Sequence, residues 1–358
     1  MRAIKMRFFK WFFLAILAIP GLSLAVGLNN PPAPLSAEAL GMGEAVAADG
    51  NVYNGTAFNP ALLANAPYLG EIGLGLNASN SILGIGDYLS SSSNSNSSAS
   101  LPDKIVGLGV GFNIAMKFDD HWGVQLYGYS PGLFHFAVNG KVETITGPVY
   151  QDLVGMLTYN IAPLEDETPL TVGVNLKVVD HKVAQVSTSG SPGDFSGLQN
   201  QLNNVFNQDT FRWGLDLGLL YDFPEEHVAF GLSALDLLHS AGTIDAKVGD
   251  PLYGVNLDPA PVVVKFGVSW HPIKQFVLNA DLDDLLSDTS YYSGQGLGNH
   301  VKLGLSYDLL GILIIRGGYS NGNPSVGGGL PFLGINYAYA VDDFTQIYTH
   351  YLIFKANM

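Results

Sequence analysis

The chain has 358 residues, of which 47% are apolar and only 13% charged, and its formal net charge is −15. The acidic balance excludes nucleic acid as a partner, because no basic patch could neutralise phosphates. Cysteine is absent, which excludes disulfides and cysteine-based metal or nucleophilic sites. The charged fraction lies well below the roughly 25% that is typical of soluble proteins.

Residues 1–25 are predicted to be a secretory signal peptide. Four basic residues come first, the short apolar run 11–19 follows, and small side chains end at Ala25. The alternative is a membrane anchor, but the apolar run is too short and too broken for one. Cleavage would remove four positive and no negative charges, so the mature chain would have a net charge of −19.

Residues 26–69 are rich in glycine, alanine and asparagine and show no regular apolar period. Within them, "FNPALLAN" predicts a short helix, because Asn59 is a good N-cap, Pro60 suits the first helical position and Ala61 favours helix. Small residues can pack closely inside a crowded barrel lumen. We therefore interpret 26–69 as a plug, or hatch, that folds inward. Composition alone leaves a simple periplasmic lead-in equally open.

Residues 70–358 contain a series of segments in which apolar and less apolar residues alternate. In "FRWGLDLGLLY" (211–221) large apolar residues share one face, while glycine, Arg212 and Asp216 share the other. "VGLGVGFNIAM", "VVVKFGVSW", "QFVLNADLDDL" and "VKLGLSY" alternate in the same way. Alternation in segments of about ten residues, with no apolar run long enough for a spanning helix, predicts an all-β protein, a transmembrane antiparallel β-barrel.

The connections between these segments alternate between short and long, as expected for periplasmic turns and outer loops. The short turns are 118–121, 162–169, 222–226, 271–274 and 308–311, and the long connections are 81–103, 131–148, 187–210, 237–260 and 286–298. When "SVGGGL" (325–330) is counted as a strand of its own, and Leu133–Asn139 as part of a loop or an extension of a strand, the number of strands is about fourteen. The carboxyl terminus then ends on the periplasmic side.

Six charged residues occupy the face that should point into the lumen: Arg212, Asp216, Lys265, Asp281, Asp283 and Arg316. Charges inside a barrel are tolerated when they are paired or hydrated. We favour ion pairs between plug and wall over ligand binding. The carboxylates around Asp281 could hold a cation, but a solvated acidic group is favoured and no metal site is predicted. On this register, Leu217→Arg on the lipid face should impair assembly, and Gly218→Ser on the lumen face should be mild.

The stretch 41–64, "GMGEAVAADGNVYNGTAFNPALLA", resembles the amino-terminal signature of FadL-type outer-membrane proteins and of their PorV-like and TraF-like relatives. The matching residues are Gly41, Gly43, Ala45, Asp49 and the run Asn59-Pro60-Ala61. "IRGGYSNGNPSVGGGL", "INYAYA" and "VLNADLDDLLSD" are similar to segments of the PorV/TraF-like branch. The resemblance implies a fourteen-stranded barrel whose amino-terminal segment plugs the lumen.

The chain shows no catalytic or cofactor motif, and we expect a non-enzymatic protein in the outer membrane of a Gram-negative bacterium, in contact with its lipid. Two functions are compatible with the sequence. One is a plugged channel for hydrophobic or amphipathic small molecules. The other is a non-transporting barrel that serves a secretion or conjugation apparatus as an assembly or binding component.

Overall fold

The computed structural model describes residues 34–50, 55–66, 69–82, 104–119, 121–139, 142–161, 169–190, 197, 199–201, 211–240, 242–243, 256–257, 262–285, 300–341 and 347–357. The predicted signal peptide lies outside these residues. Within them, no helix is long and apolar enough to cross a membrane.

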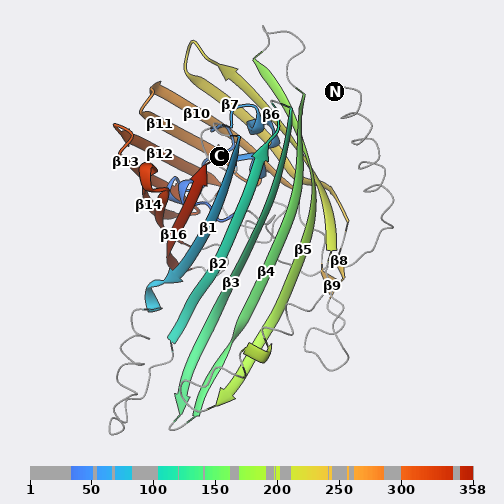
Figure 1. Ribbon diagram of the computed structural model, residues 1–358, viewed down its shortest axis with the longest axis vertical. Helices are drawn as coiled ribbons and strands as arrows, with labels where there is room; N and C mark the ends of the chain where they lie inside the picture. The colour runs from blue at the N-terminus through green and yellow to red at the C-terminus, as the bar shows by residue number, and fades with distance from the viewer. Residues whose placement is uncertain are drawn as a thin grey trace.

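Among the described residues, fourteen antiparallel strands form one closed barrel, which confirms the predicted fold (Figure 1). They are β1 (Gly70–Ser79), β2 (Lys104–Lys117), β3 (Trp122–Asn139), β4 (Val142–Ile161), β5 (Leu170–Gly190), β6 (Phe211–Phe223), β7 (Val228–His239), β10 (Val263–Ile273), β11 (Phe276–Leu282), β12 (Val301–Leu309), β13 (Leu313–Ser320), β14 (Asn323–Leu330), β15 (Ile335–Val341) and β16 (Tyr348–Asn357). β1 pairs with β16 and closes the ring. A separate two-stranded ladder joins β8 (Gly242–Thr243) to β9 (Asn256–Leu257).

We call the end where β1 begins and β16 ends the near end, and the opposite end the far end. The wall is uneven in height. β2 to β5 have 14, 18, 20 and 21 residues, whereas β11 to β15 have between 7 and 9. The long strands, in green, continue well beyond the rest of the wall (Figure 1).

The predicted alternation agrees with the observed burial along β6. Phe211, Trp213, Leu217, Leu219 and Tyr221 are exposed on the outer face, while the even-numbered residues of the strand, 212–222, are buried or half-buried. Such a period of two places one side-chain set against the surroundings and the other in the interior. "SVGGGL" lies in β14, as the parity argument predicts.

The expectation that 131–148 forms a long loop is wrong. These residues extend β3 and β4, which form a hairpin that ends at Asn139 and Val142. Pro131 and Pro148 suggested a loop because proline cannot donate to a strand ladder. In the structure, the recorded β3–β4 pairs skip both prolines, whereas the ladders to β2 and β5 continue through them.

Candidate functional site in the barrel interior

The described residues 34–50 and 55–66, which we call the interior segment, lie inside the ring of strands. Helix α2 (Ala37–Gly41) contacts β13 to β16, and the 3-10 helix η2 (Pro60–Leu63) contacts β4, β5 and β6. A second 3-10 turn, η1 (Gly55–Ala57), contacts η2. Leu35 lies over Gly75 of β1 and Gly111 of β2. Contacts on opposite sides of a closed ring require the segment to pass through its interior.

Glycines in the wall allow the backbone of the segment to come unusually close. A Cβ atom added at Gly173 of β5 would overlap the backbone of Pro60 and Ala61, and one added at Gly231 would overlap the carbonyl of Ala47. At Gly218 it would overlap the Asn59 side chain. The expectation that Gly218→Ser is mild is therefore wrong, because this lumen position is already filled.

Gly41 and Gly43 fit two tight places beside β13 and β14. A Cβ atom on Gly41 would come within 3.2 Å of Cα of Gly327. Gly43 has φ +63°, and a Cβ there would lie 2.6 Å from the backbone of Tyr319. Left-handed φ and close backbone contact both favour glycine.

Asn59 is fully buried and joins three parts of the molecule. Its side-chain Oδ1 accepts a hydrogen bond from the Ala61 N–H at 3.1 Å, which caps η2, and Pro60 takes the first helical position. Its Nδ2 donates to the Ala47 carbonyl at 2.7 Å and to the Leu219 carbonyl of β6 at 3.1 Å. One side chain thus links η2, the first part of the segment and the wall.

Two polar side chains of β11, the acceptor Asp281 and the donor Asn279, hold residues 45–49. Asp281 Oδ2 accepts from the N–H groups of Val46 and Ala47 at 2.7 and 2.8 Å. Asn279 Nδ2 donates to the Ala45 carbonyl at 2.8 Å and to Asp49 Oδ2 at 2.9 Å. Asp281 therefore contacts the backbone of the segment, and no cation is needed to explain its position.

A chain of alternating charges runs from the wall to Glu44. Asp283 accepts from Lys265 at 2.9 Å and from Lys302 at 2.8 Å, and Lys302 also contacts Glu44 at 2.6 Å. Burial alone would raise the pKa of the Asp283 carboxyl, but the two lysines outweigh it and hold this pKa well below its usual range.

A second group of charges surrounds Glu38 of α2. Lys355 of β16 lies 2.5 Å from its carboxylate, and Arg316 of β13 lies 3.5 Å from it. Arg316 also donates to Asn336 Oδ1 at 3.1 Å, and Lys355 lies 3.5 Å from Glu71 of β1. The segment thus has charged contacts with β16, one of the two strands of the closing seam, and with β13.

Asp216 and Arg212 on β6 lie apart from these charge chains. Asp216 is bound by Lys177 at 2.8 Å and reaches the segment only through Asn175, whose Nδ2 donates to Asp216 at 3.2 Å and to the Thr56 carbonyl at 2.8 Å. Arg212 is half-buried, and its Nε has no hydrogen-bond partner among the described residues.

Sequence reasoning missed the partners that the segment itself supplies and several in the wall: Glu38, Glu44, Asn175, Lys177, Asn279, Lys302 and Lys355. A signal was available. The described segment carries three acidic residues (Glu38, Glu44 and Asp49) and no basic one. Acidic groups placed in an interior need cations from the wall. Lys302 in "VKLGLSY" occupies the inward face of its strand.

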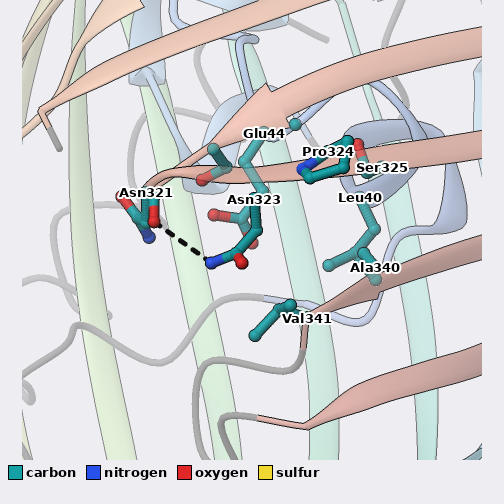
Figure 2. Close-up of a pocket in the computed structure, with 10 residues that line it drawn as sticks. Leu40, Glu44, Asn321, Asn323, Pro324, Ser325, Ala340 and Val341 are labelled. Carbon is teal, nitrogen blue, oxygen red and sulfur yellow. Dashed lines mark hydrogen bonds between the residues drawn. The ribbon is translucent and has the colours of Figure 1, made fainter. Parts of the chain in front are cut away.

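A small hollow opens where the segment meets the far-end tips of β13, β14 and β15. Leu40 and Glu44 line it from the segment, with Asn323 and Pro324 on one side and Val341 on another (Figure 2). Asn323 Nδ2 donates to the Asn321 carbonyl at 3.1 Å across the turn. The lining mixes amide, carboxylate and aliphatic groups, so it is suited to an amphipathic contact.

The chain matches no protein-family model and no curated protein sequence. It is similar in structure to the toluene transporter TbuX of Ralstonia pickettii (13% identity, 91% of this chain and 98% of that chain covered, TM-score 0.54). It is also similar to the deltaS2 mutant of the monoaromatic hydrocarbon channel TodX (13%, 90% and 96%, 0.54) and to the Pseudomonas putida toluene transporter TodX (12%, 93% and 98%, 0.51). These structures are described as monoaromatic hydrocarbon channels or toluene transporters. At this identity the similarity establishes a shared fold, and the chain has the closed barrel of these channels.

Proposed function

We propose that the protein is a channel in the outer membrane of a Gram-negative bacterium, which admits hydrophobic or amphipathic small molecules and carries its own plug. The observation that carries the proposal is the interior segment, which passes through the barrel and contacts strands all around it. A segment in this place would have to shift before a solute could pass. It therefore supplies a gate as well as a barrier.

The proposed substrate class rests on the descriptions of the similar structures. The similar structures are described as toluene or monoaromatic hydrocarbon channels. Apolar solutes dissolve in the membrane itself, so a conduit for them must keep them from water rather than offer an ion-selective pore.

A second candidate function is a non-transporting barrel that serves a secretion or conjugation apparatus, in line with the resemblance to the PorV/TraF-like branch. The observation in its favour is the dense anchoring of the segment. Charged contacts at Glu38 and Glu44 and buried amides at Asn59, Asn175 and Asn279 all oppose displacement. A permanently closed barrel would present its loops or rim to a partner.

A measurement of uptake separates the two candidate functions. A strain lacking the protein should take up labelled aromatic hydrocarbons or fatty acids more slowly than the parent strain, and the wild-type gene should restore uptake. Equal uptake in both strains would favour the non-transporting barrel.

Deleting residues 41–57 tests the plug directly. The barrel should still insert, since its closure depends on strand pairing, and single-channel conductance in a planar bilayer should rise because the lumen loses its contents. Asn59→Ala in the full-length chain should loosen the segment and raise conductance less than the deletion, because it removes only part of the contacts of the segment. Wild-type conductance from an inserted deletion variant would show that the segment does not close the pore.

A further inference from the structure

Two neighbouring turns at the near end expose large apolar side chains. Leu309 ends β12, Leu310 and Ile312 lie in the turn to β13, and Phe332 and Leu333 lie in the 3-10 turn η5 (Pro331–Leu333) between β14 and β15. Leu310 is 82% exposed and Phe332 66%. The turns are adjacent because β13 pairs with β14. We call these five residues the apolar rim.

Packing within the barrel does not explain why residue 310 is a leucine, because its side chain is almost fully exposed. Its φ is +59° and that of Gly311 is +71°, a pair of left-handed residues for which asparagine and glycine are preferred. Asp308 Oδ1 accepts from the Gly311 N–H at 2.7 Å and stabilises the turn. A strained and almost fully exposed leucine gains nothing from internal packing, so its surroundings must favour it.

Two other turns at the near end carry more charged groups. Asp222 lies near the end of β6 and Glu225 and Glu226 lie in the turn to β7, while Asp119 and His121 lie between β2 and β3, next to the exposed Phe118. Carboxylates of this kind belong in water. At the near end, carboxylates therefore lie beside β2, β3, β6 and β7, whereas the turns that join β12 to β13 and β14 to β15 expose large apolar side chains.

The short strands β11–β15 cannot span a membrane by themselves. Strands of eight residues, tilted as in such barrels, cover about 20 Å, whereas the apolar band of an outer-membrane barrel is about 25 Å tall. Exposed Leu303, Leu305 and Leu309 form a column on the outer face of β12 that leads directly to Leu310. The apolar rim continues this column and supplies the missing height.

We propose that the apolar rim is immersed in the acyl chains of the inner leaflet. The near end of the barrel would then be inserted more deeply into the membrane at β12–β15 than at β2–β7. The proposal rests on the proposed membrane location. The occupant is lipid rather than a protein, because the rim is continuous with the outer apolar face of β12 and completes its height.

The absence of cysteine in the chain allows a direct test by single-cysteine spin labelling. The probes are Leu310→Cys and Phe332→Cys, with Glu225→Cys as the matched control on the acidic side and Leu305→Cys as a reference on the outer face of β12. Each labelled full-length protein is placed in vesicles of phosphatidylethanolamine and phosphatidylglycerol. Collision rates with oxygen, which concentrates in lipid, and with a water-soluble nickel complex are then measured.

We expect the oxygen-to-nickel ratio at positions 310 and 332 to be several-fold above that at 225 and close to that at 305. A ratio at 310 and 332 equal to that at 225 would overturn the proposal by placing the rim in water. Low collision rates with both reagents would overturn it by showing a protein contact. A water-like ratio at 305 would instead contradict the membrane barrel itself.

Discussion

At the scale of single residues, the interior is fitted around the backbone of the amino-terminal segment. Gly173 and Gly218 allow η2 to lie against the wall, and Asn59 satisfies two carbonyls as well as its own helix. Helix-cap chemistry at Asn59 was readable from the sequence. Its contacts with Ala47 and Leu219 were not, because they depend on how distant parts of the chain meet.

Gly173→Ala is expected to displace η2, because the new methyl group would overlap the Pro60 and Ala61 backbone. Overpacking of this kind costs about 1–3 kcal/mol. A protease of broad specificity should cut residues 34–66 faster in the variant than in the wild type, as followed by mass spectrometry. Gly155→Ala is the control, since a Cβ there meets no atom within 4 Å. Equal cleavage of both variants would contradict the close fit.

Asn59→Ala should lower the free energy of unfolding by more than a lost cap alone, for which about 1 kcal/mol is typical. The carbonyls of Ala47 and Leu219 would lose their buried donor, and each unsatisfied group costs about 1–3 kcal/mol. Urea unfolding in detergent micelles measures the change. Asn160→Ala, which removes a single long bond of 3.3 Å to Ala61, should cost less. The opposite order would show that Asn59 does not hold the segment.

At the scale of elements, the periodicity of the sequence predicts strands well and their lengths poorly. In β6, apolar residues alternate with less apolar ones in the sequence, and burial alternates with the same period of two in the structure. The far ends of β3 and β4 were missed because Pro131 and Pro148 are signals for loops, whereas the recorded pairing between these two strands passes over both prolines. The acidic interior segment and the inward position of Lys302 indicated that such ion pairs exist, but not which residues form them, because Lys302 and Glu44 are 258 positions apart in the chain.

Leu217→Arg should impair assembly of β6 into the membrane. Leu217 is exposed on the outer face of the strand, and an arginine near the bilayer midplane costs about 2–4 kcal/mol in such barrels. The yield of folded protein in the outer-membrane fraction measures the effect. Leu217→Met, which keeps the apolar surface, should assemble normally. An arginine variant that assembled as well as the methionine variant would contradict the assigned outer face.

At the scale of the whole molecule, a closed ring leaves no strand edge unpaired within the wall. Closure of this kind satisfies every backbone group inside lipid and gives such barrels their resistance to denaturants. The wall of this barrel is uneven in height, because β2–β5 have between 14 and 21 residues and β11–β15 have between 7 and 9.

The mature protein is expected in the outer-membrane fraction, with different gel mobility before and after boiling in dodecyl sulfate. The folded barrel should keep its compact form in cold detergent because its hydrogen bonds are shielded from water. Cell fractionation followed by paired gels provides the measurement. Recovery of folded protein from the soluble periplasm, without detergent, would contradict the membrane location.

The pairing of β1 with β16 has a consequence for the order of assembly. Glu71 pairs with Asn357, so the last ladder joins residues from opposite ends of the barrel sequence. Contacts so distant along the chain form slowly, because a long loop must close first. The interior segment precedes β1 and contacts β13 to β16 as well as the strands opposite them. If the interior segment is enclosed before the seam forms, its Glu38 can pair with Lys355 while β16 docks. This ion pair would then help to set the register of the last strand.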